Sequence, residues 1–143
     1  MDIKTAIENY LSITSSKGMD EETRTQRLIA SLDELAMLSH KVQYNFDDAD
    51  YPDPPEKRYK ETREKMGNLF PSLGYYNVAL DISDKMGGSS ISIGDAIDDL
   101  TDIFGDLQEI IWRYENTSKD DALFYFRNTF RTHASEEIAA LSA

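Results

Sequence analysis

The sequence predicts an all-α protein, a compact and mostly antiparallel bundle of five to six helices that forms a single domain over residues 1–143. Two observations carry this prediction. Apolar residues in every long segment recur three and four positions apart, as they do on one face of a helix. The connections are short, with one exception, and short connections place consecutive helices antiparallel. A hydrophobic fraction of 40% in 143 residues is enough for a buried core.

Two helices are expected in the first 45 residues. The first covers about 2–16 and ends before Gly18, and the second begins after the N-cap Asp20 and reaches about residue 45. A loop at 47–55 follows, because its three prolines cannot continue a helix. Tyr51 lies between the acids and prolines of this loop, which is either a solvated connector or a lid.

Four further helices are expected, at about 55–70, 72–86, 93–116 and 119–141. Pro71 ends or kinks the first of them, because the residue before a proline resists helical geometry. Ser92 and Ser118 each open a capping-box pattern at the start of a helix. The alternation in Ser90-Ile-Ser-Ile-Gly is typical of a strand but is too short to predict one.

The helix expected at 93–116 carries six acids on one side, within an arc of about 100°. They are Asp95, Asp98, Asp99, Asp102, Asp106 and Glu109. Like charges at these spacings repel by about 0.2–0.5 kcal/mol per pair on an exposed helix, so partner cations are expected. The arc borders the apolar face of the same helix, which places some carboxylates at the rim of the core. Arg113 continues the stripe and can pair with Glu109.

The helix expected at 119–141 has polar residues on its apolar side. Arg127, His133 and Glu137 fall on or beside the arc that should face the core, and a buried carboxylate needs a partner or a metal. We therefore expect at least two acids of the stripe to lie close to this helix or to the basic segment 57–65, with Arg63 contributing. The candidate polar site comprises Asp98, Asp99, Asp102, Asp106, Arg127, His133 and Glu137.

Three interpretations of this site stay open. In the first, arginines and lysines neutralise the acids and the role is structural. In the second, Asp98, Asp102, His133 and Glu137 bind Mg²⁺ or Mn²⁺, because the spacing Asp98-Asp-Leu-Thr-Asp102 puts oxygen ligands on adjacent turns. Such a site would serve a phosphate or diphosphate hydrolase. In the third, the acidic face binds an unknown protein partner. We favour a structural or interaction module without a resident cofactor.

Composition excludes several other classes. The net charge of −12 argues against nucleic-acid binding and against docking on anionic membranes. No apolar run approaches the roughly 20 residues that span a bilayer, and no secretion signal is visible at the N-terminus. The absence of cysteine excludes thiolate chemistry and fits a cytoplasmic location. No nucleophile and base pair is recognisable, so enzymatic activity stays open.

Two segments resemble a known family. Gly94-Asp-Ala-Ile-Asp-Asp-Leu100 and the downstream residues Phe126, Arg127, Phe130 and His133, spaced F-R-x-x-F-x-x-H, are similar to a bacterial family of small proteins of unknown function. The resemblance covers about residue 20 to the C-terminus. It implies an all-helical domain with no established activity, and it carries no catalytic residue across.

Overall fold

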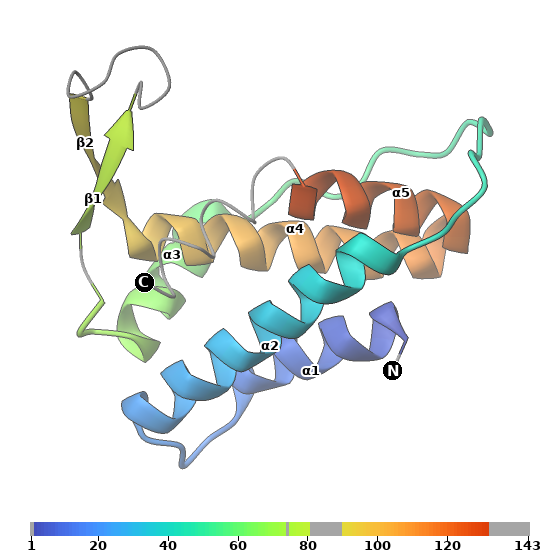
Figure 1. Ribbon diagram of the computed structural model, residues 1–143. Helices are drawn as coiled ribbons and strands as arrows, with labels where there is room; N and C mark the ends of the chain where they lie inside the picture. The colour runs from blue at the N-terminus through green and yellow to red at the C-terminus, as the bar shows by residue number, and fades with distance from the viewer. Residues whose placement is uncertain (1, 74, 81–89, 132–143) are drawn as a thin grey trace.

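The computed structural model describes residues 2–73, 75–80 and 90–131 (Figure 1). In this part of the chain, five helices surround a core and two strands form a hairpin. The elements are α1 (Ile3–Ser15), α2 (Glu21–Lys41), α3 (Tyr59–Leu69), β1 (Tyr75–Leu80), β2 (Ser90–Asp95), α4 (Ala96–Asn116) and α5 (Lys119–Thr129). The predicted all-α bundle is confirmed. No described helix is long and apolar enough to cross a bilayer.

The core is built around α4. Helices α1, α3 and α5 all pack against α4, and α2 packs against α1. Figure 1 shows α1 and α2 side by side as a helical hairpin beneath α4. The centre of the apolar side of α4 is covered, with Leu100, Ile103, Leu107 and Ile110 each at most 1% exposed. Removing one such side chain costs about 2–5 kcal/mol, so these residues hold the bundle together.

Local capping signals are read correctly from the sequence at three positions. Asp20 accepts a hydrogen bond from the Thr23 backbone N–H at 2.7 Å, and Ser118 accepts one from the Asp121 N–H at 3.1 Å. Gly18 has a positive φ of 79° just after α1, a conformation that glycine adopts without strain. The buried Arg24 then donates to the Ser16 carbonyl at 2.8 Å and so satisfies an acceptor beyond the end of α1.

The predicted helix at 72–86 is wrong, because residues 75–80 form β1. This strand pairs antiparallel with β2, in a register that joins Tyr75 to Asp95 and Leu80 to Ser90. Tyr75, Tyr76 and Val78 are residue types that favour strands. The alternation beginning at Ser90 is therefore a real strand signal. Neither strand can be predicted from its own residues alone, because most of the stabilisation of a hairpin comes from the pairs of side chains across it.

Three helix boundaries also differ from the prediction. Helix α4 begins at Ala96 and not near 93, because Asp95 is the N-cap: its carboxylate accepts from the Ile97 N–H at 3.0 Å, while Ser92 lies in β2. Helix α2 ends at Lys41, and residues 42–46 then extend over α5, where Tyr44 and Phe46 contact Phe124. Helix α3 begins at Tyr59. The expected continuation of the last helix from 132 to 141 lies outside the described residues.

Candidate functional site

The first acids of the stripe are neutralised by α3. The Arg63 guanidinium donates from Nε to Asp98 Oδ1 at 2.7 Å and from Nη2 to Asp95 Oδ2 at 2.8 Å. The Tyr59 hydroxyl donates to the same Asp98 oxygen at 2.7 Å. The hydrogen bond from Tyr59 and the contact with Arg63 hold the pKa of Asp98 below its usual value, against the effect of partial burial. The bond to Asp98 also raises the pKa of Tyr59 to about 12.

A second contact joins the segment before α3 to the middle of α4. Lys57 Nζ forms an ion pair with Asp106 Oδ1. The lysine stem crosses Gly105, where an added Cβ would lie 3.3 Å from Lys57 Cδ. Glycine at this position therefore allows the close approach. The expectation that at least two acids of the stripe meet the segment 57–65 is confirmed by Asp98 and Asp106.

Asp99 and Asp102 occupy different environments on the same stripe. Asp99 is half-buried and Asp102 is exposed. Burial, and after it the negative charge of Asp102, raises the pKa of Asp99 above its usual value. Among the described residues, no three acids or histidines are close enough together to hold a metal ion. His133 and Glu137, the other two expected metal ligands, lie outside the described residues, so the metal site stays a prediction.

Arg127 does not meet the stripe. Its guanidinium carbon lies 5.8 Å from the centroid of the Tyr44 ring, and no ion pair joins it to α4 among the described residues. The prediction is wrong here because α5 turns Arg127 toward the segment that follows α2. The cations that reach the acidic face come from Arg63 in α3 and from Lys57 just before it, both within the segment 57–65 that the sequence offered as the alternative to the last helix.

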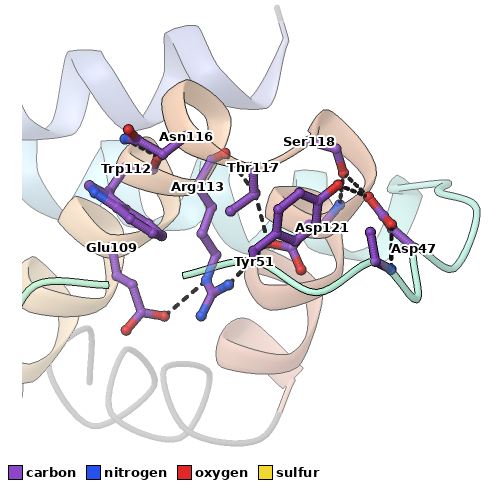
Figure 2. A network of polar contacts seen from close by, with 10 residues as sticks. Asp47, Tyr51, Glu109, Trp112, Arg113, Asn116, Thr117, Ser118 and Asp121 are labelled. Atoms are coloured by element: carbon purple, nitrogen blue, oxygen red, sulfur yellow. Dashed lines mark hydrogen bonds and ion pairs between the residues drawn. The ribbon is translucent and has the colours of Figure 1, made fainter. Parts of the chain in front are cut away.

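The most buried ion-pair network in the described part of the chain lies where α4 turns into α5 (Figure 2). Arg113 is 8% exposed, and it donates from Nε to Glu109 Oε2 at 3.2 Å and from Nη1 to Asp121 Oδ2 at 3.0 Å. Its guanidinium carbon also lies 3.4 Å from the centroid of the Tyr125 ring. The contact with Glu109 follows from the predicted spacing, whereas Asp121 enters the sequence prediction only as the last residue of the capping box that Ser118 opens.

The proline-rich loop is fastened to this network, as Figure 2 shows. Asp47 accepts hydrogen bonds from the Ser118 hydroxyl and from the Tyr51 hydroxyl, and its other oxygen accepts from the Ala49 N–H at 3.0 Å. The bond from Ser118, and then that from Tyr51, lower the pKa of Asp47. Asp47 therefore fastens the loop to the α4–α5 turn, and Tyr51 supports this carboxylate from within the loop.

The loop also presents an aromatic surface. Phe46 is 74% exposed, and its ring lies 6.1 Å from that of Phe124, edge to face. A hollow of about 380 Å³ lies beside these two rings. We call it the Phe46 surface, and its lining residues are Phe46, Asp47, Asp48, Ala49, Asp121, Phe124 and Tyr125. Three of the seven are acids, and none of these described lining residues is basic.

The fold defines this chain as a small helical-bundle protein with a β-hairpin leading into α4. No protein-family model and no curated protein matches the chain. A solved structure does match: protein BF1032 from Bacteroides fragilis has a TM-score of 0.73 and 16% sequence identity, over 97% of this chain and 84% of that chain. At this identity the likeness is one of fold. The resemblance to a bacterial family of helical proteins stays a prediction.

Proposed function

We propose that this chain is a protein-interaction module of the cytoplasm that binds a basic, apolar segment of a partner protein on the Phe46 surface. The observation that carries the proposal is the 74% exposure of Phe46 on a loop that Asp47 ties to the bundle. Burying a phenylalanine side chain stabilises a complex by about 1.5–3 kcal/mol. An anchored aromatic ring offers this gain without the cost of ordering the loop.

Charge supports a basic partner. Asp47 and Asp121 line the hollow but are engaged within the chain, while Asp48 is exposed and Asp50 and Asp53 follow it along the loop. Such a surface attracts cationic segments and speeds their association. A second copy of this chain would bring a further charge of −12, so self-association here is opposed. The acidic stripe of α4 is less suited, because Arg63 and Lys57 already pair with it.

The test compares affinity capture from lysate by the wild type, Phe46→Ala and Met37→Ala. Met37, on α2, is also exposed, at 51%, and serves as the matched control for a lost apolar side chain. The proposal expects a partner that the wild type and Met37→Ala retain, that Phe46→Ala loses and that high salt releases. The contacted segment of that partner must be basic. An acidic segment, or equal capture by all three proteins, would overturn the proposal.

The alternative function, a metal-dependent hydrolase, stays a prediction that rests on the spacing of Asp98 and Asp102 in the sequence. Thermal unfolding with Mg²⁺ or Mn²⁺ against a chelator tests it, because an ion that binds only the folded state raises the melting temperature. A rise that Asp102→Asn abolishes would favour the hydrolase over the interaction module.

A further inference from the structure

A second hollow, of about 540 Å³, lies at the end of the bundle where α1 begins and α2 ends. Figure 1 shows these two ends close to the end of α4 and the start of α5. The lining residues come from all four helices and from the residues beside them: Asp2, Ile3, Lys4, Leu38, Lys41, Val42, Gln43, Tyr114, Lys119 and Leu123. None of them lines the Phe46 surface. The volume of this second hollow is within the range of small-molecule sites in proteins.

The charge of this hollow is opposite to that of the whole chain. Three lysines and one acid line it, whereas the chain as a whole has 27 acids and 15 lysines and arginines. The acid, Asp2, is occupied as the N-cap of α1, where it accepts from the Thr5 N–H at 2.9 Å and from the Thr5 hydroxyl at 3.1 Å. The rim is therefore a local positive site on an acidic protein.

Two of the lysines have no acidic partner in the described part of the chain. Lys4 lies 4.0 Å from Glu8, but Lys41 and Lys119 form no ion pair there. Lys119 is also the first residue of α5, where the positive end of the helix disfavours a cation. Asp120 and Asp121 follow it in the first turn, but Asp121 is paired with Arg113, so a bound anion would add to the compensation that Asp120 supplies.

The interior of the hollow is apolar. Ile3, Leu38 and Val42 are partly buried and Leu123 is 6% exposed, so an aliphatic chain laid against them would lose contact with water. Tyr114 adds a hydroxyl that can donate a hydrogen bond, since a tyrosine is protonated at neutral pH. Burial, and after it the charge of Asp2, raises the pKa of Tyr114 to about 12. A ligand that matches both features has a charged head and an apolar tail.

We propose that the hollow bounded by Lys4, Lys41 and Lys119 binds a small amphipathic anion of the class of a medium-chain carboxylate. The carboxylate lies between Lys41 and Lys119, and the aliphatic chain lies on Leu38, Val42 and Leu123. The apolar lining distinguishes this ligand from a free inorganic anion.

Thermal unfolding with octanoate tests the proposal, with acetate, octanol and octyltrimethylammonium as controls at equal concentration. Acetate carries the head alone, octanol the tail alone, and octyltrimethylammonium the opposite charge. Octanoate is expected to raise the melting temperature, because it binds the folded state, while the three controls do not. Absence of a rise with octanoate, or an equal rise with octanol, would overturn the proposal.

Charge-matched variants locate the site. The double variant Lys41→Gln/Lys119→Gln should bind octanoate at least tenfold more weakly by calorimetry. The control Lys17→Gln/Lys60→Gln removes the same charge from exposed positions that do not line the hollow, and it should bind as the wild type does. An equal loss of octanoate affinity in both double variants would show that net charge, and not this site, causes the loss. Sedimentation adds a further outcome: a wild-type dimer that only Lys41→Gln/Lys119→Gln dissociates would assign the hollow to a second copy and overturn the proposal.

Discussion

The Arg113 guanidinium lies over the Tyr125 ring, 3.4 Å from its centroid, and at the same time pairs with Asp121 at 3.0 Å. One side chain of α4 thus contacts both a ring and a carboxylate of α5. The stacked contact adds about 1–2 kcal/mol when it is desolvated. Because the side chains of Arg113 and Asp121 are 9% and 12% exposed, water cannot readily replace either partner.

Arg113→Met should lower the free energy of unfolding by about 3 kcal/mol, because it leaves the Asp121 carboxylate buried without its cation. Chemical denaturation measures this loss. Arg58→Met is the matched control, since the Arg58 side chain is 81% exposed and its contact with Glu61 is 3.6 Å long. The control should change stability by less than about 0.5 kcal/mol. Adding Asp121→Asn to Arg113→Met should recover part of the loss; no recovery would show that packing dominates over charge.

Asp98 should make stability fall at acid pH. Its pKa is lowered in the folded state, so the stability that it contributes is fully present above the unfolded value near 3.8. That contribution is lost as the pH falls through the lower, folded value. Denaturation followed across the acid range should therefore show a shallower fall for Asp98→Asn than for the wild type. Asp33→Asn, with the same charge change on the exposed side of α2, should keep the slope of the wild type.

Asp99 should have the opposite effect. Its pKa is raised by burial and by Asp102, so the stability it contributes is complete below the unfolded value and is lost as the pH rises through the folded one. Asp99→Asn removes this titration, so its free energy of unfolding should fall less than that of the wild type as the pH rises above about 3.8. Chemical denaturation followed from acid to neutral pH measures the difference. An equal fall in both proteins would contradict the raised pKa of Asp99.

Tyr10→Phe should leave stability unchanged or raise it by up to about 1 kcal/mol. The Tyr10 ring is 0% exposed, and its hydroxyl is buried without a hydrogen-bond partner among the described residues. Removing the hydroxyl takes away an unsatisfied polar group and leaves the apolar packing in place. Tyr10→Leu is the comparison, since the lost ring should destabilise the core. A clear loss of melting temperature in Tyr10→Phe would reveal a partner for the hydroxyl, such as an enclosed water.

Sequence alone determined the features that depend on neighbours along the chain. Asp20 and Ser118 were recognisable as N-caps because a cap bonds to a backbone N–H three residues ahead. Arg113 and Glu109 were recognisable as a pair because residues four apart lie on one helix face. The need for cations on the acidic stripe followed from repulsion within a single helix.

Tertiary structure decided which partners met those needs. The pairing of β1 with β2 joins Tyr75 to Asp95. Local periodicity does not predict such a contact, because the two residues are far apart along the chain. Arg63 and not Arg127 meets Asp98 because α3 packs on the acidic side of α4, while α5 brings Asp121 to Arg113. The physical reason is that an exposed charge gains little from any one partner. The basic residue that pairs with each acid is therefore decided by which helices bury their apolar faces against one another.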